Sequence, residues 1–216
     1  MANISKLNIS KYKTSPYWDF GNNILYKLCN DNFKHDRDDI TLTKVLFIGR
    51  IYAAAIERRK NKKDTENNND DFYIRKVAPT FRRLKLDKQL SELRRLDLEI
   101  DNIPQILEVH NNLLISLSEI TGLEKRSFCS KYLHFHLPQL YFIYDSRALT
   151  ALRDFTSSTP KVLSHIPKLP NVDKDYAIFF CKCFDLKNKI EIEHNINLTT
   201  RQLDNLLLSK ANSKKL

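Results

Sequence analysis

Glycine is scarce in this sequence, with only three among 216 residues, at Gly21, Gly49 and Gly122. A dinucleotide-binding loop, a P-loop and an all-β fold with many tight turns all require more glycine than this. The four cysteines form no C-x2-C pair, and His134 and His136 point to different sides of a helix, so no metal-binding set emerges. No apolar run reaches the roughly 18–20 residues that span a bilayer. We therefore expect a cytoplasmic protein with no metal, no other cofactor and no membrane partner.

Positive charge is concentrated in one part of the chain. Lys and Arg number 36 against 26 Asp and Glu, which gives a net charge of +10. Between Arg50 and Arg95 there are 14 Lys and Arg and seven acids, and this difference of +7 is most of the total. Such a cluster indicates a polyanionic partner such as nucleic acid, although a surface ion pair is the alternative role for each residue. The candidate nucleic-acid-binding residues are Arg50, Arg58, Arg59, Arg82, Arg83, Arg126 and Arg147.

Helical periodicity runs through nearly the whole chain and predicts an all-α fold, an irregular bundle of about nine helices. The main predicted helices cover residues 16–29, 41–60, 102–121, 124–136, 145–155, 173–194 and 199–216. The apolar run at 140–144 is the one segment that suggests an extended strand. We expect a single domain over residues 1–216, with a helical N-terminal part (14–100), a motif-bearing part (101–198) and a C-terminal helix (199–216).

Local signals mark several helix ends. Asn102 followed by Pro104 is typical of a helix start, and Gly122 of a helix end. Thr199 and Gln202 have the spacing of a capping box. Within 41–60, Gly49, Ala53 and Ala54 are predicted to form a small-residue patch where another helix or a ligand backbone comes close.

The segment 121–150 contains the residues best suited to chemistry. Lys125 and Lys131 lie on one predicted helix, and Asp145 occupies the N-cap position of the next one. An N-cap carboxylate accepts hydrogen bonds from free backbone N–H groups, and the helix dipole favours its ionised form. A carboxylate held in this way is suited to stabilise a developing cation or to take a proton from a nucleophile. Capping alone is the alternative role of Asp145.

This segment resembles the helix-hairpin-helix DNA glycosylases, in particular the bacterial 8-oxoguanine DNA glycosylase-like group. In that family a helix-borne lysine precedes an N-capping aspartate by about twenty residues. Here Lys125 precedes Asp145 by 20 positions, with Pro138-Gln139 between them. The strings SKYLHF and IYDSRA within 130–148, and IGRIYAAAIERR at 48–59, are similar to sequences of the group.

The resemblance implies a two-lobed helical fold and a mechanism in which the target base is flipped out of the nucleic acid. A lysine amine then attacks the sugar C1′ as the base departs, a Schiff base forms, and an aspartate stabilises the positive charge on the sugar. By position, Lys125 is the implied nucleophile and Asp145 its electrostatic partner. Lys131 is the alternative nucleophile, because it belongs to the shared SKYLHF string. Six residues correspond to about 240° around a helix, so both lysines cannot face one pocket.

The implied partner is nucleic acid, DNA rather than RNA, and the occurrence of similar proteins in bacterial defence loci implies a protein partner there. The family hairpin holds a phosphate with a glycine-rich turn, whereas residues 120–124 here contain one glycine and an acid. This degenerate hairpin favours the main alternative, a catalytically inactive module on the same scaffold that binds nucleic acid or a nucleotide. A helical assembly protein with an acidic protein partner is a third interpretation.

Overall fold

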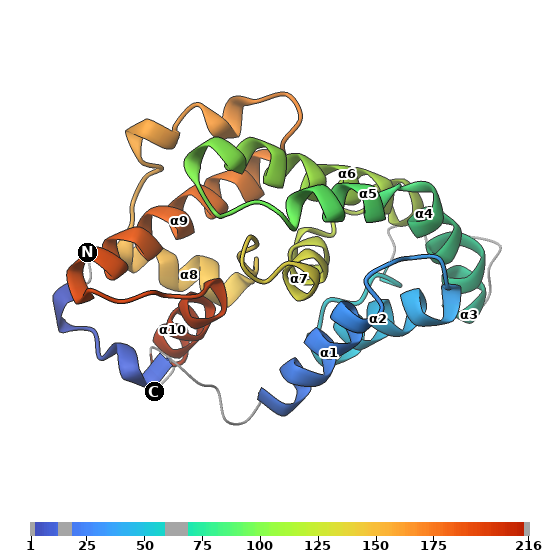
Figure 1. Cartoon of the computed structure of the whole chain (residues 1–216), viewed down its shortest axis with the longest axis horizontal. Coiled ribbons are helices and arrows are strands. Elements are labelled where there is room, and N and C mark those ends of the chain that lie inside the picture. The colour runs from blue at the N-terminus through green and yellow to red at the C-terminus, as the bar shows by residue number, and fades with distance from the viewer. Residues whose placement is uncertain (1–2, 13–18, 59–68, 214–216) are drawn as a thin grey trace.

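The computed structural model describes residues 3–12, 19–58 and 69–213. All regular structure in these ranges is helical, and none of these residues forms a β-strand (Figure 1). The predicted all-α fold class is therefore confirmed. The candidate Arg59 lies outside the described residues.

Ten α-helices and several short helical turns make up the described chain. The α-helices are α1 (Asp19–Asp31), α2 (Asp38–Ile51), α3 (Asn69–Phe72), α4 (Ala78–Arg83), α5 (Leu86–Leu93), α6 (Ile103–Thr121), α7 (Arg126–His136), α8 (Ser146–Phe155), α9 (Lys174–His194) and α10 (Thr200–Asn212). A π-helical turn, η3 (Tyr73–Val77), joins α3 to α4, and the 3-10 turns are η1 (Ile4–Lys6), η2 (Ile9–Tyr12), η4 (Ile100–Asn102), η5 (Lys161–Leu163) and η6 (Ile166–Lys168). None of these described helices is both long enough and apolar enough to cross a membrane.

Helix α7 is the central element of the fold. It lies between the α1–α2 pair and the group formed by α8, α9 and α10 (Figure 1), and it contacts α1, α2 and α6. Every residue from Phe128 to His136 is buried. Because a buried polar group is costly unless it is hydrogen-bonded, the polar side chains of α7 need partners within the protein. Helix α7 thus carries buried polar side chains within the apolar core.

The predicted ends of helix α6 and the predicted start of helix α10 are confirmed. Helix α6 begins after Asn102 and ends at Gly122, which has a φ of 67° and donates its N–H to Ser118 O at 2.8 Å. The Thr199–Gln202 capping box precedes α10. In each case the residues that hydrogen-bond the free backbone groups are within four positions of the helix end. A short stretch of sequence is therefore enough to predict where these helices begin or end.

The prediction of one helix over residues 41–60 is wrong, because α2 ends at Ile51. Tyr52 donates its N–H to Ile48 O at 3.2 Å and Ala54 donates to Gly49 O at 3.1 Å, which closes a Schellman motif. Ala53 takes the left-handed position of this motif, with a φ of 52°. Glycine normally occupies that position, and an L-residue there costs about 1–2 kcal/mol. The sequence therefore carries no stop signal at this point.

The suggested strand at 140–144 is also not formed. Residues 141–145 have no regular secondary structure, and three of their backbone groups are hydrogen-bonded to side chains. His134 Nδ1 donates to Tyr141 O at 2.8 Å, the Tyr176 hydroxyl donates to Phe142 O at 2.8 Å, and Tyr144 N–H donates to Ser130 Oγ at 2.9 Å. These bonds replace the ladder that a neighbouring strand would supply. They attach the segment to α7 and α9 and fix where Asp145 lies.

Candidate functional site

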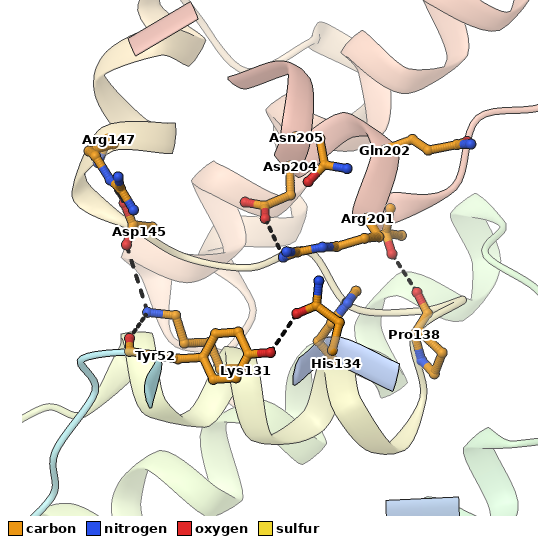
Figure 2. Close-up of polar contacts among 12 residues, drawn as sticks. Tyr52, Lys131, His134, Pro138, Asp145, Arg147, Arg201, Gln202, Asp204 and Asn205 are labelled. Carbon is orange, nitrogen blue, oxygen red and sulfur yellow. Dashed lines mark hydrogen bonds and ion pairs between the residues drawn. The ribbon is translucent and has the colours of Figure 1, made fainter. Parts of the chain in front are cut away.

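A pocket of about 230 Å³ lies where four separate parts of the chain meet. These parts are the end of α2, the middle of α7, the segment leading into α8, and α10. The lining residues are Ile51, Tyr52, Ala53, Lys131, Ile143, Asp145, Arg147, Arg201, Asp204 and Leu208. Figure 2 shows the polar members of this set around the pocket. A concave site with apolar walls and a few converging charged groups is the usual form of a small-molecule or base-binding site.

Lys131 brings a buried amine to the pocket wall. Its side chain is 6% exposed, and its Nζ lies 3.7 Å from Asp145 Oδ2. The same Nζ donates to Tyr52 O at 3.1 Å (Figure 2). It also donates to Ser127 Oγ at 2.9 Å. Burial lowers the pKa of the Lys131 amine, while the nearby carboxylates of Asp145 and Asp204 act in the opposite direction. A larger fraction of this amine is therefore unprotonated at neutral pH than is usual for a lysine.

The early end of α2 supplies one partner of this amine. The last carbonyl groups of a helix have no partner within the helix, and they carry the negative end of its dipole. Tyr52 is the C-cap residue of α2, and its carbonyl oxygen accepts a hydrogen bond from Lys131. The Tyr52 hydroxyl donates to Asn22 Oδ1 at 2.5 Å, which anchors the side chain to α1. The Ala53 turn thus places a hydrogen-bond acceptor where the lysine needs it.

Asp145 is the N-cap residue of α8, as predicted. Its Oδ1 accepts a hydrogen bond from Arg147 N at 2.9 Å, while its Oδ2 faces the Lys131 amine. The Arg147 side chain lies 3.5 Å from Oδ1 and is 50% exposed, at the outer part of the pocket. The carboxylate is therefore fixed by the helix on one side and directed at the amine on the other. An amine and a carboxylate so placed are suited to nucleophilic attack with electrostatic support.

Lys125, the nucleophile implied by sequence spacing, is not part of this pocket. It occupies the N-cap position of α7, and its Nζ donates to Ala55 O at 3.2 Å and to Arg58 O at 2.5 Å. The structure therefore brings Lys131, and not Lys125, to Asp145. The 20-residue spacing does not bring Lys125 to this pocket, because Lys125 precedes the first turn of α7 and meets the chain that returns from α2.

Arg201 and Asp204 are pocket residues that the sequence analysis missed. Both lie on α10, which packs against α8, and Arg201 Nη1 donates to Asp204 Oδ2 at 2.7 Å. Burial raises the pKa of Asp204 to about 6. One signal was present in the sequence: Asp204 falls on the buried face of α10 beside Leu203 and Leu207, where a charge is unusual.

The two histidines of α7 have structural hydrogen bonds. His134 Nδ1 donates to Tyr141 O, and its Nε2 accepts from the Tyr26 hydroxyl at 2.6 Å. Burial lowers the pKa of His134 to about 3, so it is neutral and both nitrogens are occupied. His136 donates to Tyr132 O at 2.7 Å through Nδ1. Among the described residues, no cluster of three or more His, Cys, Asp or Glu side chains is placed to hold a metal ion.

The predicted nucleic-acid-binding arginines are in different environments. Arg50 pairs with Glu57 at 2.9 Å, and Arg82 pairs with Asp38. Arg58 and Arg83 are exposed. Of the predicted arginines that the structure describes, Arg147 alone lines the pocket.

Arg126 is held in an acidic cluster. Its Nε and Nη2 donate to the two carboxylate oxygens of Asp173 at 2.7 and 2.9 Å, and it also pairs with Glu124 at 2.8 Å and Asp175 at 3.3 Å. Asp173 in turn caps α9 by accepting Tyr176 N–H at 2.8 Å. This geometry indicates that Arg126 joins α7 to α9 and is not free to contact phosphate.

The R126Q variant is expected to lower the free energy of unfolding by about 3 kcal/mol, because it leaves the nearly buried Asp173 carboxylate without its charged partner. Urea denaturation followed by circular dichroism measures this change. The matched control is R37Q, which removes an exposed pair with Asp39 and should leave the free energy of unfolding nearly unchanged. Equal effects of the two substitutions would contradict the structural role of Arg126.

Comparison of the chain with protein-family models, with curated proteins and with solved structures finds no match. The geometry of the pocket and the sequence itself are therefore the basis for a functional assignment.

Proposed function

We propose that this protein is a DNA N-glycosylase with lyase activity, related to the 8-oxoguanine glycosylase-like group, in which Lys131 is the nucleophile and Asp145 its electrostatic partner. The observation that carries the proposal is the buried Lys131 amine, 3.7 Å from the N-cap carboxylate of Asp145 on a pocket wall. Lysine-dependent base excision needs these two groups at this range, beside a space for a flipped base.

The chemistry follows from the two groups. The unprotonated amine of Lys131 attacks C1′, and the C1′–N bond to the base breaks with its electron pair leaving on the base. The amine loses a proton and the departing base gains one. The C1′–O4′ bond then breaks as the Lys131 nitrogen forms a double bond to C1′, and O4′ takes up the proton that this nitrogen gives up, which leaves the open sugar joined to Lys131 as an imine. Positive charge grows on the sugar during bond breakage, and the Asp145 carboxylate stabilises it.

The surroundings of the pocket support this proposal. Helices α6 and α7 contact each other and are joined by a turn at Gly122, in the order of a helix-hairpin-helix unit. Besides its single glycine and its acid, the turn departs from the family in its hydrogen bonding: Thr121 Oγ1 accepts Leu123 N–H at 3.2 Å, so this N–H is not directed at a phosphate. The half-exposed Arg147 and the net charge of +10 provide other contacts for a DNA backbone.

Borohydride trapping tests the proposal directly. The wild-type protein is incubated with oligonucleotides, each carrying one damaged or modified base, in the presence of sodium borohydride, which reduces the imine to a stable covalent adduct. We expect an adduct on a denaturing gel and release of the free base with at least one member of the panel. Absence of both across a broad panel would contradict the proposal.

The rate of adduct formation is expected to depend on pH in a specific direction. A protonated amine is not a nucleophile, so the rate should rise with pH as Lys131 loses its proton. Because burial lowers the pKa of Lys131, the rate should level off below the pKa of an ordinary lysine. Trapping rates measured across neutral to alkaline pH, with folding checked by circular dichroism, give the profile. A rate that continues to rise through the range of a surface lysine would point to a different amine.

The second candidate function is a catalytically inactive module that binds nucleic acid. It is favoured by the three contacts of the Lys131 amine, which satisfy it without any ligand. This function predicts salt-dependent binding to oligonucleotides that persists when Lys131 and Asp145 are replaced, with no adduct from the wild-type protein.

A further inference from the structure

Asp204 lines the pocket and has one carboxylate oxygen without a hydrogen-bond partner among the described residues. The residue is 4% exposed, and its Oδ2 accepts a hydrogen bond from Arg201. Its Oδ1 is buried and has no hydrogen-bond partner within the described parts of the chain, and the same holds for Arg201 Nε. Buried polar atoms in proteins are nearly always hydrogen-bonded, so an exception in a pocket wall indicates where a ligand group fits.

The position of Asp204 relative to the reactive pair is suitable for a single bound ring. In Figure 2 the second carboxylate oxygen points away from Arg201, toward the side on which Asp145 and Arg147 lie. Asp204 and Lys131 both line this pocket, and the Asp204 carboxylate acts to raise the pKa of the Lys131 amine. The pocket, at about 230 Å³, is smaller than the roughly 300–1,000 Å³ of pockets for drug-sized ligands. It therefore suits one ring system and not two stacked bases.

We propose that Asp204, held in place by Arg201, accepts a hydrogen bond from an amino group on the base that enters the pocket, and thereby selects amino-bearing bases. The identification of the ligand as a nucleic-acid base rests on the proposed function. An ionised carboxylate is an acceptor only, and carboxylates recognise exocyclic amino groups of bases in this way. A base with no amino group would leave Oδ1 without a partner.

The protonation state of Asp204 sets a pH window for this selection. The pKa of Asp204 is raised to about 6 because it is buried, and Arg201 and Lys131 act against this shift. Above that pH the carboxylate accepts hydrogen bonds, and below it a bound proton removes the preference. The charged or titratable groups that interact with Asp204 from the surrounding elements are Arg201 on α10, Lys131 on α7, Asp145 before α8, Arg147 on α8, Cys183 on α9 and Tyr26 on α1.

The probes for the test differ only in an amino group. Short single-stranded oligonucleotides carry purine, adenine or 2-aminopurine at a central nucleotide whose sugar is fluorinated at C2′, which resists excision. Binding is measured by fluorescence anisotropy at pH 7.5. We expect at least one of the two amino-bearing probes to bind the wild-type protein about tenfold or more tightly than purine, which corresponds to one hydrogen bond to a charged group.

The D204N variant should lose or reverse this preference. Because Arg201 donates to Oδ2, the amide oxygen of the variant faces Arg201 and its NH₂ group takes the position of Oδ1. The matched control is D31N, which removes an exposed carboxylate paired with Lys27 on α1 and should keep the preference. A second measurement needs only the wild-type protein: the ratio of affinities should shrink between pH 7.5 and pH 5.

The outcomes separate this inference from the proposed function. Equal binding of the three probes by the wild-type protein, or a preference that both D204N and low pH leave unchanged, would overturn the role of Asp204. A preference that depends on Asp204, without any trapped adduct, would support the recognition site and contradict the excision chemistry. If D204N does not fold, the pH dependence of the wild-type preference decides the matter.

Discussion

Replacement of Lys131 by glutamine is expected to abolish the borohydride-trapped adduct and to reduce base release by a factor of about 10³ or more. An amide cannot form an imine with C1′, so the covalent route is closed completely. Glutamine is the informative substitution because its amide keeps N–H donors directed at Tyr52 O and Ser127 Oγ, the two uncharged partners of the amine, on a side chain one bond shorter. Loss of activity in K131Q is thus not expected to come from a displaced α7.

The matched control is K125Q. Lys125 also has a pKa lowered by burial, and it belongs to the same region of the chain, but its amine is bonded to the carbonyl groups of Ala55 and Arg58 and does not line the pocket. K125Q should therefore keep the adduct and the base release. The reverse result, with activity lost in K125Q and kept in K131Q, would identify Lys125 as the nucleophile, as the 20-residue spacing to Asp145 implied.

The parts of the fold that the sequence predicted are those whose causes are local. Helix α6, with Asn102 at one end and Gly122 at the other, and the Thr199–Gln202 box before α10 each depend on residues within a few positions. The N-cap role of Asp145 is of the same kind. Helical periodicity of apolar residues also predicted the all-α fold class. This is possible because the apolar face of a helix is buried whichever element it packs against.

The parts that the sequence did not predict depend on contacts between distant segments. The end of α2 at Ile51 relies on a left-handed alanine that is stabilised by the packed structure and not by its own preference. Which lysine reaches the pocket depends on where the chain runs after that turn. The carbonyl oxygens of Ala55 and Arg58 accept hydrogen bonds from Lys125. The carbonyl oxygen of Tyr52 accepts one from Lys131. One unexpected turn therefore determined both the helix boundary and the arrangement of the site.

Arg201 and Asp204 were missed for the same reason. They are more than fifty residues beyond Asp145, and only the packing of α10 against α8 brings them to the pocket. Helical periodicity reveals a charge on a buried face but not the cavity it faces.

Replacement of Asp145 by asparagine is expected to reduce base release by about 10²–10³-fold while the fold is retained. Asparagine is as good an N-cap as aspartate, so the hydrogen bond from Arg147 N and the start of α8 should persist. In the proposed mechanism, the variant loses the negative charge that faces the sugar as the base departs. The matched control is D38N, which removes a carboxylate from the first turn of α2, outside the pocket, and should leave base release unchanged.

The pH profile of D145N distinguishes this role from a merely structural one. The Asp145 charge raises the pKa of Lys131, so its removal should lower that pKa further and leave more of the amine unprotonated. The midpoint of the trapping profile should therefore move to lower pH, while the plateau rate falls. If Asp145 acted only as a helix cap, D145N would keep the plateau rate. If Asp145 acted only by adjusting the amine, D145N would raise the rate at neutral pH. A lower plateau together with a lower midpoint is the result that an electrostatic role in bond breakage requires.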